Sequence, residues 1–103
     1  MNNDTIILSG FSNMELVDFH YHLDWQSWKD SYIELIVQGK GEKRHLRFTG
    51  VANLRIEEGF GGNLSGMEIV DISDRQWESA RIEVRNFEQD PGITFLAATM
   101  ETV

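Results

Sequence analysis

Apolar and polar residues alternate along most of this 103-residue chain. A period of two is the spacing of a β-strand with one buried face, because successive side chains point to opposite sides of a strand. The alternation is clearest over residues 14–24, with Val17, Phe19, Tyr21 and Leu23 on one side and Asp18, His20, His22 and Asp24 on the other. The pattern therefore predicts a mostly β protein.

Turn-forming residues divide the pattern into strands. We expect strands over residues 5–9, 14–24, 32–38, 43–56, 67–72, 80–88 and 93–100, with Gly50 marking a bulge or a bend. A Gly39-Lys40-Gly41 turn closes the first clear hairpin, and Pro91-Gly92 favours a type II turn in the last one. The glycine-dense residues 57–66 are expected to form a loop. Residues 73–78 are expected to form a turn or one helical turn, with Ser73 as its cap.

The length and composition fit one soluble domain over residues 1–103. The chain is 41% hydrophobic and 25% charged, and it contains no cysteine, so disulfides and thiolate chemistry are excluded. We predict an all-β domain: a curved antiparallel sheet, half-barrel or sandwich of about seven strands with one or two short helical turns. No run is long enough to span a membrane and the first residues do not resemble a secretory signal, so a cytoplasmic location is expected.

The charge of the chain is strongly negative and uneven. A formal net charge of -8 opposes direct binding to nucleic acid, which depends on Lys and Arg displacing counterions. Residues 40–55 carry +4, whereas residues 1–39 and 56–103 carry -5 and -7. A field of this kind attracts a basic partner and accelerates its arrival, although acidity also serves solubility alone.

One histidine-rich strand offers a candidate metal site. In residues 18–24, strand geometry places His20 and His22 on the same face as Asp18 and Asp24. Imidazoles with a carboxylate are a set that zinc or iron binds, and His45 is a third candidate ligand. The alternative is a strand that faces solvent or a partner and holds no metal. No nucleophile, phosphate loop or metalloprotease motif is present, so neither a catalytic residue nor a cofactor is predicted.

Tryptophans beside acidic residues form a candidate binding surface. Trp25 and Trp28 lie between Asp24 and Asp30, and Trp77 lies in a second acidic connection. The tryptophans either plug an open end of the sheet or act as interface anchors, with acids that pair with a basic partner. The full predicted set of partner-binding residues is Asp24, Trp25, Trp28, Asp30, Glu57, Glu58, Asp71, Asp74 and Trp77.

The whole pattern resembles a class of bacterial proteins. Size, acidity, lack of cysteine and the segments LSGMEIVDISDRQW (64–77) and ARIEVRNFE (80–88) are similar to small acidic β-rich immunity proteins encoded beside bacterial toxins, including those of contact-dependent inhibition systems. The resemblance implies a non-enzymatic inhibitor that covers the basic active site of a cognate toxin such as a nuclease. The rival hypotheses are a small metal-dependent enzyme or metal-binding β-barrel using His20 and His22, and a small-molecule binder using the interior of the sheet.

Overall fold

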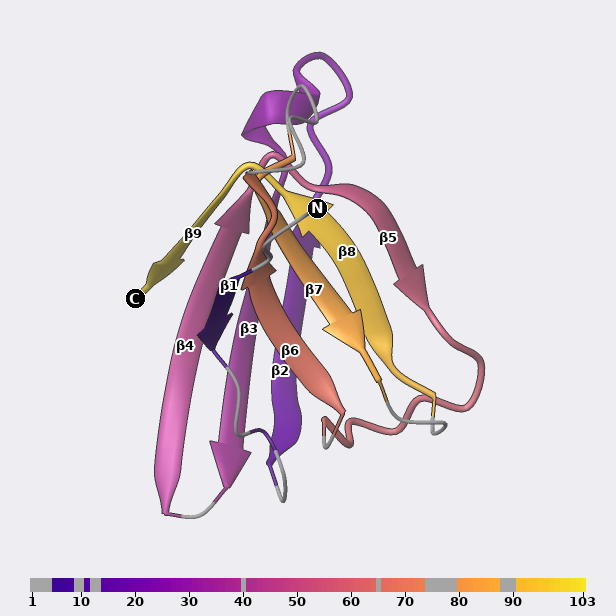
Figure 1. The fold of residues 1–103 in the computed structure, drawn as a ribbon. Helices are drawn as coiled ribbons and strands as arrows, with labels where there is room; N and C mark the ends of the chain where they lie inside the picture. The colour runs from indigo at the N-terminus through magenta and orange to yellow at the C-terminus, as the bar shows by residue number, and fades with distance from the viewer. Residues whose placement is uncertain are drawn as a thin grey trace.

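The chain folds into two facing antiparallel β-sheets (Figure 1). A computed structural model describes residues 5–8, 11, 14–39, 41–64, 66–73, 80–87 and 91–103. The described strands are β1 (Thr5–Leu8), β2 (Glu15–His22), β3 (Tyr32–Gly39), β4 (Glu42–Thr49), β5 (Ala52–Ile56), β6 (Met67–Asp71), β7 (Ile82–Asn86), β8 (Ile93–Ala97) and β9 (Thr99–Thr102). One sheet has the order β1-β6-β7-β8-β5 and the other β2-β3-β4-β9. The prediction of an all-β antiparallel fold is confirmed.

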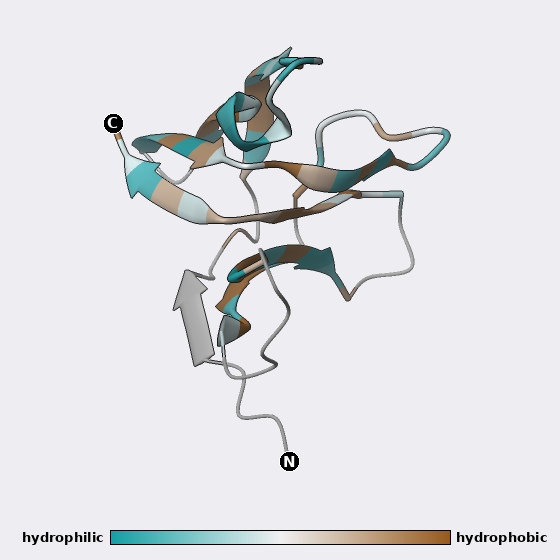
Figure 2. Ribbon diagram, turned by 90° about the horizontal axis from the view of Figure 1, so that it is seen from above, coloured by the Kyte–Doolittle hydropathy of each residue, from teal (hydrophilic) through white to brown (hydrophobic). Residues whose placement is uncertain are grey.

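The core lies between the two sheets and follows the alternation of the strands. On the four-stranded sheet, β3 and β4 contribute Ile33, Leu35, Val37, Leu46 and Phe48, all of which are buried. On the opposite sheet, Ile69, Val84, Ile93 and Phe95 face them. Phe48 and Phe95 meet edge to face, with their ring centroids 4.8 Å apart, which is a favoured aromatic geometry. Figure 2 shows the resulting bands of hydrophobic and hydrophilic residues along the strands.

Two bent strand pairs join the sheets at one end of the sandwich. The chain leaves β4 at Gly50 and enters β5 in the other sheet, and it leaves β8 at Ala98 and enters β9. The ladder is preserved across the bend, because β4 pairs with β9, β5 pairs with β8, and the Ala98 N–H donates to the Thr49 carbonyl at 2.9 Å. We call this end of the sandwich the corner end, and the end with the β3–β4 turn the hairpin end.

Gly50 makes the bend possible. Its φ of +70° is in the left-handed region, and a Cβ placed on it would lie 2.9 Å from the Cβ of Ala98. The sequence pattern predicted one strand through residues 43–56 with a bulge or a bend at Gly50. The structure has the bend, and it transfers the chain to the second sheet. The single strand expected over residues 93–100 is likewise divided at Ala98.

The alternation predicted for β2 is wrong at its start. A register shift between Leu16 and Asp18 inserts one extra residue opposite β3. Leu16 therefore packs against the core, whereas Val17 is 52% exposed. Leu23, expected on the buried face, lies beyond the end of β2 and is 61% exposed.

The short helical elements are only partly described. One 3-10 turn that the structure describes in full, η1 (Trp28–Asp30), lies between β2 and β3. Most of the turn predicted over residues 73–78 lies outside the described residues, as does the first half of the turn predicted over residues 89–92. Within the described ranges, no helix has the length and apolar character that crossing a membrane requires.

Candidate protein-binding site

The connection between β2 and β3 displays three large apolar side chains to solvent. In this segment, which we call the tryptophan loop (residues 23–30), Trp25 is 83% exposed, Leu23 61% and Trp28 42%. The loop projects beyond the sheets at the corner end (Figure 1). The idea that both tryptophans plug an open end of the sheet does not fit Trp25, because a plug is buried. Exposed apolar side chains that are gathered together, as in these eight residues, are one mark of an interaction surface.

Hydrogen bonds fix the backbone that carries these side chains. The Asp24 carboxylate accepts from the N–H groups of Gln26 at 3.0 Å and Ser27 at 3.1 Å, an Asx-type turn. The Asp24 N–H donates to Ser31 Oγ at 3.0 Å, and Ser31 is fully buried. The N–H of Asp30 donates to the Ser27 carbonyl at 2.9 Å. These hydrogen bonds restrain the backbone of the tryptophan loop at both of its ends.

The loop is also attached to the bend that joins the sheets. The Ser31 carbonyl accepts from the Gly50 N–H at 2.8 Å. The Trp28 ring lies close above Gly50, because a Cβ added to Gly50 would be 3.7 Å from Trp28 Cζ3. Trp28 is thus partly a packing residue, whereas the Trp25 side chain stays exposed to solvent.

The predicted acidic residues are divided between the two ends of the sandwich. Asp30 is exposed within the tryptophan loop. Asp71 also lies near the corner end, because the N–H of the next residue, Ile72, donates to the Arg81 carbonyl and the Arg81 N–H donates to the Ala97 carbonyl beside the bend. The Asp71 carboxylate accepts from the N–H and hydroxyl of Ser73. Asp74 and Trp77 lie outside the described residues.

Glu57 and Glu58 follow β5 at the opposite, hairpin end (Figure 1). The Glu57 carboxylate accepts from the Gly92 N–H at 3.1 Å, and the Glu57 N–H donates to the Gly92 carbonyl at 3.0 Å. Glu57 therefore has a role in joining two loops, and Glu58 remains exposed beside it. One contact surface of ordinary size would not include both these residues and the tryptophan loop.

The outer face of the four-stranded sheet carries a cluster of polar and aromatic side chains that the sequence did not single out as a site. Glu34 lies between His45, whose Nε2 is 3.4 Å from Oε2, and Arg47, whose Nη1 is 3.2 Å from Oε1. The Arg47 guanidinium lies 4.1 Å from the centroid of the Tyr32 ring, a cation–π contact. The ring of His22 stacks on Tyr32, with centroids 5.1 Å apart. The sequence feature that could have identified this cluster is the register of the β3–β4 hairpin, which places Glu34 opposite Arg47.

This arrangement bears on the metal hypothesis. His20 and His22 do share an exposed face, as the alternation predicted, and His45 projects from the same face two strands away. In the described part of the chain, no group of three or more His, Cys, Asp or Glu residues is arranged to hold a metal ion. The contacts of His22 are with Tyr32 and those of His45 are with Glu34.

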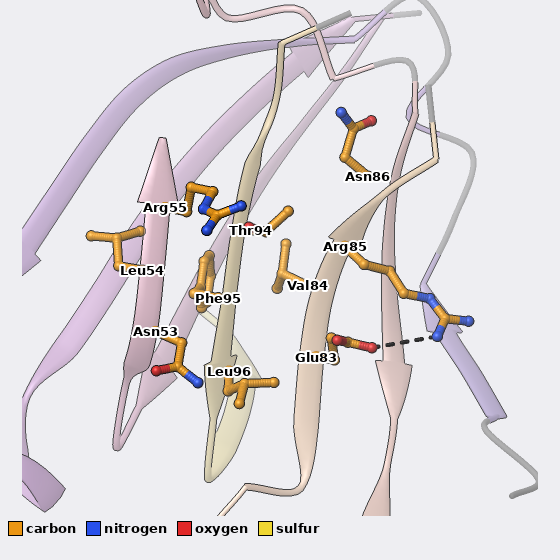
Figure 3. Close-up of a pocket in the computed structure, with 10 residues that line it drawn as sticks. All are labelled: Asn53, Leu54, Arg55, Glu83, Val84, Arg85, Asn86, Thr94, Phe95 and Leu96. Atoms are coloured by element: carbon orange, nitrogen blue, oxygen red, sulfur yellow. Dashed lines mark hydrogen bonds and ion pairs between the residues drawn. The ribbon is translucent and has the colours of Figure 1, made fainter. Parts of the chain in front are cut away.

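A shallow groove of about 610 Å³ lies on the other sheet, over β5, β7 and β8 (Figure 3). Arg55 and Arg85 both border it. Arg85 is paired with Glu83 at 3.4 Å and with Glu68 at 3.7 Å, so its charge is already neutralised. The groove presents no convergent set of acid, base and nucleophile, and the tryptophan loop is the stronger candidate site.

Comparison with known proteins adds no relative: the chain matches no protein-family model, no curated protein and no solved structure.

Proposed function

We propose that this protein is a non-enzymatic binding domain that captures a basic protein partner through the tryptophan loop. The observation that carries the proposal is Trp25, 83% exposed on a backbone fixed by the Asp24 and Ser31 hydrogen bonds. Tryptophan is the residue type most enriched among interface hot spots, and a preorganised loop loses little entropy on binding.

The magnitude of the expected contribution is large for one residue. A tryptophan side chain covers about 150–250 Å² of surface, and apolar burial contributes about 25 cal/mol per Å². Because 83% of Trp25 is exposed, covering it would contribute about 3–5 kcal/mol before the costs of association, which is typical of a hot spot. The exposed Asp30 carboxylate on the same loop supplies a charge that a basic partner can pair with.

The partner class that we favour is a bacterial toxin, so that the protein is an immunity protein. Support comes from the net charge of -8 together with the resemblance of residues 64–77 and 80–88 to immunity proteins. Toxins such as nucleases have basic clefts, and an acidic inhibitor that covers such a cleft associates rapidly through electrostatic steering.

The test is co-expression with the polypeptide encoded directly upstream of this chain, with cell growth and complex formation as readouts. We expect the intact protein to restore growth. Trp25→Ala is expected to weaken binding by roughly 30-fold or more, since a hot-spot truncation costs about 2 kcal/mol or more.

The matched control is Phe87→Ala, because Phe87 is also an exposed aromatic, at 62%, but follows β7 at the hairpin end. Unchanged binding by Trp25→Ala, or an equal loss in both variants, would show that the tryptophan loop is not the contact surface. Failure of the upstream polypeptide to bind at all would refute the toxin assignment.

A further inference from the structure

The edge of β2 carries a second surface, independent of the proposed function. β2 is the outer strand of its sheet and pairs with β3 on one side. On its other side, the described residues 60–64 border its first half. The Leu16 N–H donates to the Gly62 carbonyl at 2.8 Å, Glu15 bridges to Asn63, and residues 60–62 line a shallow hollow with residues 16–19. From Val17 onward, no described strand pairs with this edge.

The edge of β2 that no described strand covers offers backbone hydrogen-bonding groups. The Asp24 N–H points to the β3 side, where it donates to Ser31 Oγ. Backbone groups of successive strand residues point alternately to the two sides, so those of Phe19, Tyr21 and Leu23 point outward. Such an edge is a template for an added strand.

We propose that this edge pairs with the same edge of a second copy of the chain, antiparallel, about a two-fold axis at His20. In that register Asp18 faces His22 of the other copy, and Phe19 faces Tyr21. Val17 lies at the register shift of β2 and is left out of this match. The segment Asp18–His22 thus matches itself in reverse: acid with histidine, and aromatic with aromatic.

The complementarity of Asp18 and His22 favours a second copy over an unrelated strand. The acid–histidine pair occurs twice, once on each side of the axis, and hydrogen-bonded side-chain pairs directly across strands stabilise pairing. The imidazole N–H of His22 can donate to the Asp18 carboxylate. The dimer would have one continuous sheet of eight strands. Because the two β2 strands run in opposite directions, the two tryptophan loops would lie at opposite ends and remain open to partners.

A single cysteine provides the first test. His20 faces its own copy at a non-hydrogen-bonded position, where Cα atoms are roughly 4.5 Å apart, within the range that a disulfide spans. The chain has no cysteine of its own, so any cross-link in His20→Cys is unambiguous. We expect a disulfide-linked dimer under mild oxidation. The matched control is Glu101→Cys, an exposed position on the same sheet face in the opposite edge strand, β9. Equal cross-linking at both positions, or none at His20→Cys, overturns the proposal.

Exchange of Asp18 and His22 provides the second test, measured by sedimentation equilibrium of the full chain. His22→Asp places two carboxylates opposite each other on both sides of the axis, and we expect dimerisation to weaken by about tenfold or more. Asp18→His combined with His22→Asp restores an acid–histidine pair in the same register and should restore the dimer. Thr99→Asp adds a carboxylate to β9 and should have no effect.

Restoration by the double exchange is the decisive result, because a merely structural effect of His22→Asp would not be repaired by Asp18→His. An unmodified chain that stays monomeric at all concentrations, or a double variant no better than His22→Asp, overturns the proposal.

Discussion

The contact between Gly50 and Ala98 provides the sharpest test of the bend that joins the two sheets. Gly50→Ala introduces a Cβ at a φ of +70° and 2.9 Å from the Cβ of Ala98. The left-handed backbone costs about 1–2 kcal/mol for a residue with a Cβ. Overpacking adds about 1–3 kcal/mol, and the reduced entropy of the unfolded chain offsets about 0.4–1 kcal/mol. We expect a net loss of about 2–3 kcal/mol in the free energy of unfolding.

Gly41→Ala is the matched control for this substitution. Gly41 has nearly the same φ, +72°, but nothing lies within 4 Å of an added Cβ. Its substitution therefore carries the backbone cost alone, about 1 kcal/mol or less after the entropic offset. The difference between the two variants measures the contact with Ala98.

The assay is urea denaturation followed by tryptophan fluorescence and by circular dichroism, with melting temperatures as a second readout. A loss of about 2–3 kcal/mol corresponds to a decrease of about 8–24 °C in Tm for a domain of this size. Ala98→Gly in the Gly50→Ala background should recover the part of the loss due to the clash. If Gly50→Ala is no less stable than Gly41→Ala, or if Ala98→Gly recovers nothing, then the close packing at the bend is refuted.

Two further predictions concern the core and the loop. Phe48→Ala removes a fully buried ring that meets Phe95 edge to face. It should lower the free energy of unfolding by about 3–5 kcal/mol in the same urea titration, and a loss below about 1 kcal/mol would contradict the place of Phe48 in the core. Ser31→Ala removes the acceptor of the Asp24 N–H and should cost about 1–2 kcal/mol. It should also accelerate amide hydrogen exchange at Asp24, and unchanged exchange would show that the hydroxyl does not hold the loop.

The alternation of apolar and polar residues was sufficient to predict the described core strands, and it also predicted the buried positions of β4. Alternation identifies which side of a strand is buried, and the β3–β4 hairpin shows this directly in Leu35 and Leu46. It does not identify the sheet to which a strand belongs. The even-numbered apolar positions continue across Gly50, so the transfer to the second sheet leaves no trace in the periodicity. One inserted residue, Val17, was likewise enough to shift the buried face of β2.

The candidate site was predictable where it is local in sequence and unpredictable where it is not. Trp25 and Asp30 belong to one short connection, so their proximity follows from the chain itself. Glu57 was grouped with them because it is acidic. Three strands separate Glu57 from the tryptophan loop, and composition does not show that the two lie at opposite ends of the sandwich. The Tyr32 and Arg47 contact required cross-strand register, which hairpin pairing could have supplied.

The bent strands also order the events of folding. β8 and β9 follow every other described strand in the chain, yet β8 lies between β5 and β7 in one sheet, and β9 completes the other. During synthesis, neither sheet can be finished until residues 93–102 have emerged from the ribosome. Until then, Ile33, Leu46 and the other core side chains of the nascent chain are incompletely covered and prone to aggregation. Contacts between segments so far apart in the sequence are also slow to form.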